Sequence, residues 1–325
     1  MKTIQTILFL LISIGVYSQT PKAYITNYGE NFISVVDIET KQKITDITTG
    51  NKPHGVAVSP DGNLIAVSNE GDNTVSIISA TSNKVIETVQ VGKVPHQLSF
   101  SLDGKYILTA INADHMVDVI STASYKIVNS VAVGRNPHIV LPMPDGKNIW
   151  VTSEGDNKIV RINLDEMKVV AEIPVFGFPR VMTATPDGKF IYLTIRWFHG
   201  LVKIDAEQNK IVSWVQLPIS SKFDNEGKAA HGLCVSPDGK TVYLTSQFTD
   251  DVSAIDVATD KILKNIIVGK NPNWIELTPD GKYAVVSNTS SNDVSIIDIE
   301  NWELTATIPV GKNPKRLWVA VTNNK

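Results

Sequence analysis

Apolar positions fall in short runs along the chain, and polar turn residues bound each run. The stretch 54–91 shows the pattern, with apolar-rich runs at 54–58, 63–68, 74–78 and 85–91. The sequences Ser-Pro-Asp-Gly, Asn-Glu-Gly-Asp-Asn and Ala-Thr-Ser-Asn separate these runs. Proline presets φ at a turn, Asp bonds its own backbone and Gly supplies positive φ, so these separators favour tight turns. The stretch therefore predicts four short strands joined by hairpins.

The same four-strand unit recurs with a period of 42 residues, and a proline usually opens its first strand. The seven anchor positions are Pro53, Pro95, Pro137, Pro179, Ala230, Pro272 and Pro314. Ala230 takes the proline position after a nine-residue insertion that lies within 220–229. A period of this length is typical of stacked or ring-like repeat architectures. We expect the aspartates of the recurring Asp-Gly turns, such as Asp61, to be structural.

The two ends of the chain are offset within the repeat. The chain enters at 22–27 on a segment that matches a second strand, and it ends at 314–320 on one that matches a first strand. The sequence therefore predicts an all-β, seven-bladed β-propeller with four antiparallel strands per blade. The N- and C-terminal strands would share one blade and close the ring, which leaves no open sheet edge.

Several motifs resemble the YVTN-type β-propeller repeat of YncE-like and archaeal surface-layer proteins. They are Tyr24-Ile-Thr-Asn27, Pro53-His-Gly-Val56, Ser59-Pro-Asp-Gly62, Val67-Ser-Asn69 and Ser295-Ile-Ile-Asp298. The resemblance covers essentially the whole chain after its first residues. It implies the propeller fold but no single activity, because similar rings include binding proteins, lactonases and haem-carrying redox proteins.

The N-terminus has the features of an export signal. Lys2 precedes a mainly apolar stretch at 4–16, and compact residues follow up to Ser18. We therefore expect residues 1–18 to be a secretory signal peptide, residues 19–325 to form one propeller domain, and the protein to be secreted to the bacterial periplasm or the exterior. The stretch is too short for a membrane span, so we expect none after signal cleavage. The only cysteine, Cys234, is expected to be a buried filler.

The charge balance bears on partners. The net charge is −3, with no polybasic run, which makes nucleic acid an unlikely partner and favours a small molecule or a protein. We also expect a monomer.

Two repeat positions hold charged and polar residues where the rest of the unit holds apolar or turn residues. In propellers of this kind the first strand of each blade lines the central channel, so the residue after each anchor should lie at one channel mouth. This first column comprises His54, His96, His138, Arg180, His231, Asn273 and Lys315. The residue that follows the second strand should return to the same mouth. This second column comprises Tyr28, Glu70, Asn112, Glu154, Arg196, Gln247 and Thr289.

The histidines of the first column allow two interpretations. Pro-His belongs to the repeat, so the imidazoles could be inherited and could simply satisfy backbone groups. Alternatively, His54, His96 and His138 lie on successive blades and could bind a divalent metal or act as a base, with Glu70 and Glu154 nearby. The two remaining histidines, His115 and His199, are expected to be exposed turn residues.

The opposite arc of the ring is cationic and aromatic. It carries Arg180, Arg196, Trp197, Phe198, Phe248 and Trp274. The arginines could bind a carboxylate or phosphate, or they could form salt bridges with Glu154 and other acids. The insertion before His231 is either a lid over this arc or a neutral surface loop.

These observations favour a binding module that takes a ligand or partner at the channel mouth through the two columns and Trp197. The first alternative is a lactonase-like or metal-dependent hydrolase. The second alternative is a redox protein that carries noncovalent haem or another metal.

Overall fold

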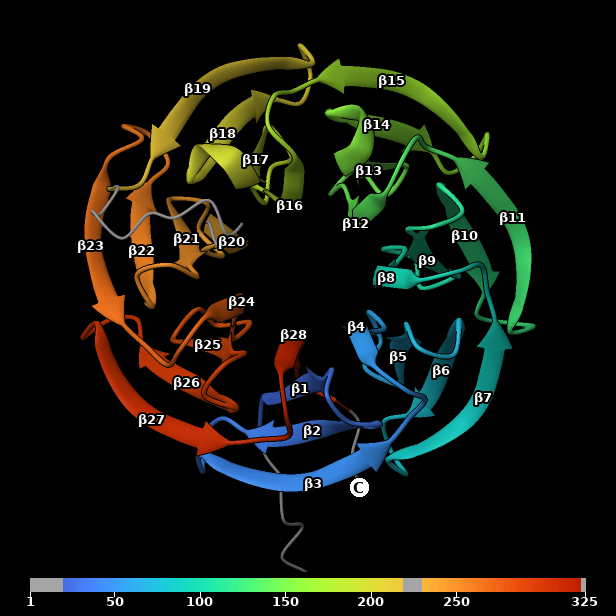
Figure 1. Cartoon of the computed structure of the whole chain (residues 1–325), viewed down its shortest axis with the longest axis horizontal. Helices are drawn as coiled ribbons and strands as arrows, with labels where there is room; N and C mark the ends of the chain where they lie inside the picture. Colours follow the sequence, from blue (N-terminus) through green and yellow to red (C-terminus); the bar gives the residue numbers. More distant parts are fainter. Residues whose placement is uncertain (1–19, 219–229, 323–325) are drawn as a thin grey trace, which may run out of the picture.

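Seven four-stranded antiparallel sheets form the blades of a ring in the computed structural model, which describes residues 20–218 and 230–322 (Figure 1). The predicted seven-bladed propeller is therefore confirmed, with four strands in each blade. The predicted signal peptide and the insertion at 220–229 lie outside the described residues.

One blade combines the two ends of the chain, and it contains β28 (Pro314–Ala320), β1 (Lys22–Asn27), β2 (Phe32–Asp37) and β3 (Gln42–Thr48). The second contains β4 (Pro53–Val58), β5 (Leu64–Asn69), β6 (Thr74–Ser79) and β7 (Lys84–Gln90). The third contains β8 (Pro95–Phe100), β9 (Tyr106–Ile111), β10 (Met116–Ser121) and β11 (Lys126–Ala132). The fourth contains β12 (Pro137–Pro142), β13 (Asn148–Ser153), β14 (Lys158–Asn163) and β15 (Lys168–Pro174).

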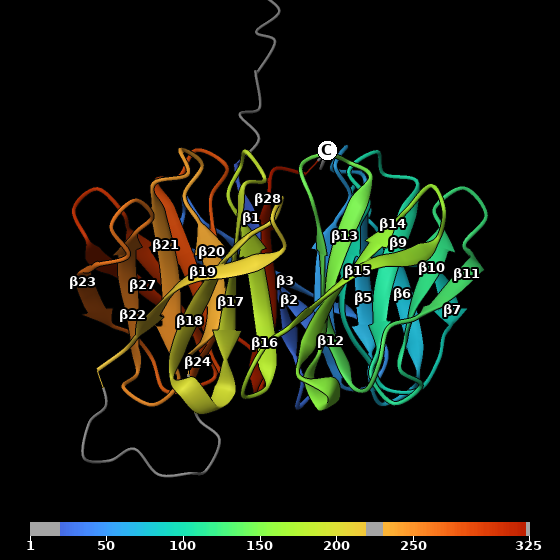
Figure 2. The same cartoon turned by 90° about the horizontal axis from the view of Figure 1, so that it is seen from above.

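The fifth blade contains β16 (Pro179–Ala184), β17 (Phe190–Ile195), β18 (Gly200–Asp205) and β19 (Lys210–Gln216). The sixth contains β20 (Ala230–Val235), β21 (Thr241–Ser246), β22 (Asp251–Asp256) and β23 (Ile262–Ile267). The seventh contains β24 (Pro272–Leu277), β25 (Tyr283–Asn288), β26 (Asp293–Asp298) and β27 (Glu303–Pro309). Two 3-10 turns, η1 (Glu154–Asp156) and η2 (Arg196–Phe198), follow second strands on the same side of the ring (Figure 2).

The shared blade closes the ring as predicted. Strand β28 pairs antiparallel with β1, and Tyr24 lies opposite Trp318 in the register. The Tyr24 hydroxyl and the Thr322 Oγ1 are 2.8 Å apart, which ties the last described residue to the first strand. The closing contacts therefore join residues almost 300 positions apart in the sequence.

The Asp-Gly turns have the predicted structural role. In the first of them the Ser59 hydroxyl donates to the Asp61 carboxylate at 2.6 Å, and the Leu64 N–H donates to the Ser59 hydroxyl at 2.9 Å. Gly62 has a φ of 71°, which favours glycine. The hydrogen bond from Ser59 is the main cause that lowers the pKa of Asp61.

The core lies between neighbouring blades, where the aliphatic residues of the three inner strands pack. The outer strands β3, β7 and β11 are mostly exposed by contrast. Within the described residues, no helix has the length and apolar character needed to cross a membrane.

Candidate functional site

Four first-column imidazoles gather at one mouth of the central channel, on the side of η1 and η2. The His54 and His96 rings stack with centroids 4.5 Å apart, and the His138 centroid lies 5.2 Å from that of His96. The His231 ring is 6.1 Å from that of His138 on the far side. The structure therefore brings together histidines from β4, β8, β12 and β20.

Hydrogen bonds between blades fix the backbone of this column. Thr26 and Ser68, near the ends of β1 and β5, donate to the carbonyls of His54 at 2.9 Å and His96 at 2.5 Å. Thr152, Thr194 and Ser287 make the corresponding bonds to Arg180, His231 and Lys315. A register shift between Pro53 and Val56 accompanies the bond at β4, as expected where a bulge redirects a side chain.

Gly55 permits this close approach of the blades. A Cβ at this position would lie 2.7 Å from the His96 carbonyl oxygen and 2.9 Å from the Ser68 hydroxyl. The contact involves backbone, which cannot move aside as a flexible side chain can. The glycine of the Pro-His-Gly motif therefore has a packing role.

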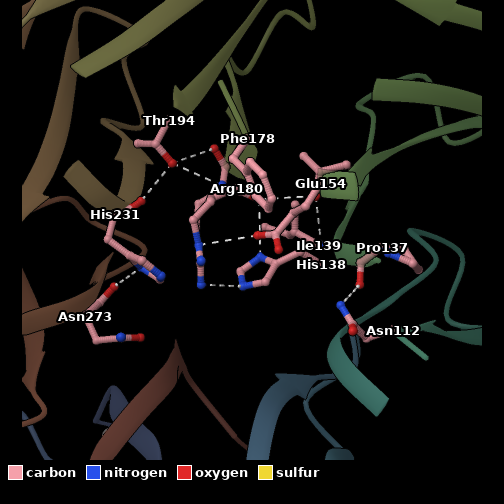
Figure 3. A network of polar contacts seen from close by, with 12 residues as sticks. Asn112, Pro137, His138, Ile139, Glu154, Phe178, Arg180, Thr194, His231 and Asn273 are labelled. Carbon is pink, nitrogen blue, oxygen red and sulfur yellow. Dashed lines mark hydrogen bonds and ion pairs between the residues drawn. The ribbon is translucent and has the colours of Figure 1, made fainter. Parts of the chain in front are cut away.

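Two guanidinium groups meet at the ring of His138, and Figure 3 shows the one from Arg180. Its Nε2 is 3.0 Å from an Arg316 Nη2 and 3.4 Å from an Arg180 Nη2, and its Nδ1 is 3.3 Å from the Arg180 carbonyl. Because guanidinium groups only donate and a carbonyl only accepts, the imidazole is neutral with its proton on Nδ1. The Nε2 lone pair is thus directed at two cations.

Arg180 also forms the salt bridge that the sequence offered as one alternative. Its Nε lies 3.4 Å from the Glu154 carboxylate, which comes from η1 (Figure 3). Burial raises the pKa of Glu154, and the neighbouring arginines oppose this shift. Burial likewise lowers the pKa of Arg180.

Arg316 is a site residue that the sequence analysis did not single out. It is 1% exposed, and its Nη1 donates to the Asn273 side chain at 2.5 Å. Within the part of the chain that the structure describes, no carboxylate lies at ion-pair distance from it, and its Nε has no hydrogen-bond partner. Burial and the charge of Arg180 lower the pKa of Arg316 to about 9.

A sequence signal for Arg316 did exist. The third residue of each first strand is otherwise small, apolar or uncharged: Gly55, Gln97, Ile139, Val181, Gly232 and Trp274. Arg316 is the only charged residue at that position of the repeat. The third residue of each first strand faces the channel, so a charged side chain at this position is buried there. Such a buried charge indicates a function in the channel.

Tyr28, Glu70 and Lys315 lie together in the part of the mouth opposite Arg180 and Glu154. The Tyr28 hydroxyl donates to the Glu70 carboxylate at 2.7 Å, and the Lys315 ammonium lies 3.9 Å from the Tyr28 ring centroid. Burial lowers the pKa of Lys315 to about 8. This part of the mouth presents an ammonium and a carboxylate on either side of a phenol ring.

His54, Glu70 and His96 form a group whose ligand atoms lie within 4.8 Å of one another. This triplet differs from the predicted set, because it contains Glu70 in place of His138. The His54 and His96 Nδ1 atoms are buried and have no hydrogen-bond partner among the described residues. Neutral imidazoles plus a carboxylate are a donor set that suits a divalent transition metal.

Burial keeps these imidazoles uncharged. It is the largest cause that lowers the pKa of His96 to about 3, and it holds the pKa values of His54, His138 and His231 well below 6.5. Nearby cations lower all four further. The His231 Nδ1 lies 2.7 Å from the Asn273 carbonyl, so the ring donates there and keeps a lone pair on Nε2.

Three uncharged second-column residues, Asn112, Gln247 and Thr289, complete the description of this column. Asn112 and Thr289 donate to the carbonyls of Pro137 at 3.1 Å and Pro314 at 2.8 Å, which are structural bonds to the next blade. Gln247 is half-buried directly after β21.

The aromatic arc is only partly assembled as predicted. Arg196 lies 5.3 Å from the ring centroid of Trp197, which is 51% exposed at the mouth. Trp274 is instead buried inside the channel beneath Arg316, since the third residue of its strand points inward. The prediction that Trp274 belongs to the mouth arc was therefore wrong.

The prediction for His199 was also wrong, whereas His115 is exposed as expected. His199 is 0% exposed, and its ring lies 6.2 Å from that of Phe248. Phe248 belongs to the next blade, at a repeat position where most other copies hold Gly, Ala or Ser, so this contact could not be expected from the repeat. Cys234 is buried as predicted, and burial raises its thiol pKa.

Comparisons with solved structures support the fold. The Pseudomonas aeruginosa periplasmic gluconolactonase superposes with a TM-score of 0.76 at 19% identity, over 93% of this chain and 99% of that one. The Kuenenia stuttgartiensis hydrazine synthase superposes with a TM-score of 0.76 at 22% identity, over 85% of this chain and 91% of that one. Dihydro-heme d1 dehydrogenase superposes with a TM-score of 0.65 at 16% identity, over 91% of this chain and 74% of that one. Likenesses at these identities establish the propeller and not its chemistry.

Family models match both parts of the sequence, whereas no curated protein matches it. The YNCE-like β-propeller model matches residues 8–140. The model described as lactonase, 7-bladed β-propeller, matches residues 132–307, which is more than half of the chain. With seven blades, a shared closing blade and these two matches, the chain belongs to the seven-bladed lactonase β-propeller family and carries the YNCE-like form of the repeat.

Proposed function

We propose that the propeller binds a small anionic ligand, bearing a carboxylate or phosphate, at the mouth formed by the two columns. The observation that carries this proposal is an excess of buried positive charge. Arg180, Arg316 and Lys315 converge on the channel, where the neighbouring carboxylates are those of Glu70 and Glu154. A buried charge without a partner is costly, so an anion that enters this mouth would offset the excess.

The accessible cations define how the ligand would bind. The Arg180 side chain is 21% exposed, and Lys315 is partly buried on the other side of the imidazoles. Arg180 would form charge-assisted hydrogen bonds with the anion, and Lys315 would contact it as a point charge. Arg316 is too deeply buried for direct contact, and it would contribute its field and hold His138 in the neutral form.

A hydrolase that opens lactones is the second candidate, favoured by the family match and by the His54, Glu70 and His96 triplet. These three residues would hold a divalent metal, and such an ion would polarise the carbonyl of a bound ester. Arg180 would then orient the acidic group of the substrate. The unpartnered imidazole nitrogens of His54 and His96 are consistent with this donor set.

The proposal includes the setting that the sequence predicts. Residues 1–18 would direct export and be removed, and residues 19–325 would act outside the cytoplasm as a single monomeric domain. The first part of this chain matches the YNCE-like family, and the gluconolactonase that it resembles in fold is described as periplasmic.

Calorimetric titration of the purified mature protein with gluconate, 6-phosphogluconate and inorganic phosphate tests the binding proposal. We expect Arg180→Gln to lower the affinity for the anion by roughly 10- to 100-fold, the effect of losing a charged hydrogen bond. Arg135→Gln is the matched control, because Arg135 pairs with Asp156 on the rim. No binding of any of these anions, or equal losses in both variants, would overturn the proposal.

Elemental analysis, an absorbance spectrum and an assay of glucono-δ-lactone opening separate the candidates. One metal per chain that is lost in a His54→Ala, His96→Ala double variant but kept in His115→Ala would favour the hydrolase, provided that lactone opening falls with the metal. If the protein binds the anion but is metal-free, colourless and inactive, only the binding-module proposal is supported.

A further inference from the structure

A cavity lies at the other mouth of the channel, where the first strands of the blades end. It has a volume of about 600 Å³. This mouth faces the side opposite η1 and η2, and the end of β28 lies there (Figure 2). The volume is in the range of sites that bind small molecules. Nothing in the proposed function uses this cavity.

The wall of this cavity is mainly apolar. Its largest side chains include Phe100, Leu141, Met182, Trp274 and Trp318. Among the described residues that line it, there is no Lys, Arg or His. The two mouths of the channel therefore differ in kind, because one is charged and the other presents aliphatic and aromatic surface.

A few polar side chains interrupt the apolar wall, and the two largest of them are Gln97 and Glu276. Gln97 is 2% exposed, and its Oε1 has no hydrogen-bond partner among the residues that the structure describes. Glu276 accepts a hydrogen bond from the Trp274 Nε1 at 3.0 Å. A few polar groups in an apolar pocket are the usual arrangement of a site that orients a small ligand. An unpartnered buried amide oxygen leaves a hydrogen bond that a ligand can supply.

We propose that this cavity is a second ligand site, which takes a small, uncharged, mainly apolar molecule with a hydrogen-bond donor such as a hydroxyl or an arylamine N–H. The apolar body would displace water from the aromatic wall, and the donor would satisfy the Gln97 oxygen. An anionic ligand would lose its hydration without meeting an opposite charge among the described lining residues, so the site discriminates against anions.

The site is separate from the anion-binding mouth. Trp274 lines the cavity and Arg316 does not, although the Arg316 guanidinium lies 4.4 Å from the Trp274 ring centroid. A ligand in the apolar cavity therefore does not reach the cations. Failure of the anion-binding proposal would leave this inference unaffected.

The probe for the test is N-phenyl-1-naphthylamine, a neutral apolar amine with one N–H donor. Its emission would rise on binding, and Trp274 and Trp318 in the wall would transfer excitation energy to it. We expect saturable binding to the mature protein. The anilinonaphthalene sulfonate with the same ring system should bind at least roughly tenfold more weakly.

Filling the cavity should abolish binding. Thr183→Trp places an indole in the cavity, whereas Thr88→Trp makes the same change on the exposed outer strand β7 and should leave binding intact. Leu102→Trp, at a rim position that is 48% exposed, gives a second blocking variant that does not depend on repacking the channel. Gln97→Leu should lower the affinity for the amine by roughly five- to tenfold, because one hydrogen bond is lost.

The absence of saturable binding would overturn the inference. So would unchanged affinity in the folded blocking variants, or equal affinity for the sulfonate. Loss of binding in Leu102→Trp with retention in Thr88→Trp would support it even if Thr183→Trp does not fold.

Discussion

The Arg316 guanidinium lies over the ring of Trp274, with 4.4 Å between its central carbon and the ring centroid. The same indole donates its N–H to Glu276 at 3.0 Å. One aromatic ring thus has a buried cation against its face and a carboxyl group at its edge. Both Arg316 and Glu276 occupy positions where the other copies of the repeat hold uncharged residues.

The buried charge of Arg316 should cost stability when no anion is bound. We expect Arg316→Met to raise the free energy of unfolding by about 1–4 kcal/mol at neutral pH, because the apolar chain fills similar space without a buried charge. Urea denaturation of both proteins measures this. Arg316→Lys is the control, because it keeps the charge and should give no such gain. A loss of stability in the Met variant would show that the hydrogen bonds to Asn273 and His138 outweigh the burial cost.

His231 should make the fold sensitive to acid. Its folded pKa lies well below 6.5, so the unfolded chain binds its proton first and stability falls as the pH drops below about 6.5. The contribution is about 1.4 kcal/mol per pH unit. In His231→Gln, the slope of the unfolding free energy between pH 6 and 5 should be shallower by this amount, measured by denaturation with a chelator present. The exposed His115, changed to Gln, should leave the slope unchanged.

The fold could be predicted because the repeat states it seven times. Each copy shows the same strand lengths and turns, and the offset ends alone imply that β1 and β28 pair. The predicted first strand at 54–58 agrees with β4 (Pro53–Val58) to within one residue. A single copy would not have been enough, because short apolar runs are ambiguous by themselves.

The site could be predicted less completely, because side-chain direction depends on details that the repeat does not show. The first column gathers at the mouth since a bulge and blade-to-blade hydrogen bonds turn it inward. The inward direction of the third residue, which buries Arg316 and Trp274, was not recognised. The prediction for His199 was wrong for another reason, because its ring lies beside Phe248 of the next blade, and most other copies hold a small residue at the Phe248 position.

Glu276 should have the opposite pH dependence to His231. Burial raises its pKa to about 8, above the usual value of 4.5. The folded state then binds the proton more tightly, so its stabilising effect is full below pH 4.5 and is lost as the pH rises to about 8. Glu276→Gln, which stays neutral, should gain stability over the native protein between pH 5 and pH 9. Glu300, on an exposed turn, is the control for the same change. Parallel stability profiles for the native and Glu276→Gln proteins would contradict a buried neutral carboxyl.

Closure of the ring depends on β28, so damage there should spread through the whole molecule. Leu317 is fully buried on this strand, and Leu317→Ala should cost about 2–5 kcal/mol of unfolding free energy through the cavity it leaves. Leu304→Ala, on the outer strand β27 where Leu304 is 42% exposed, should cost far less. Removal of residues 315–325 should go further and lower the melting temperature strongly, since β1 would lose its partner and expose a sheet edge. Circular dichroism melting curves measure both effects. An unchanged melting temperature after the truncation would show that the six remaining complete blades hold together without the shared blade.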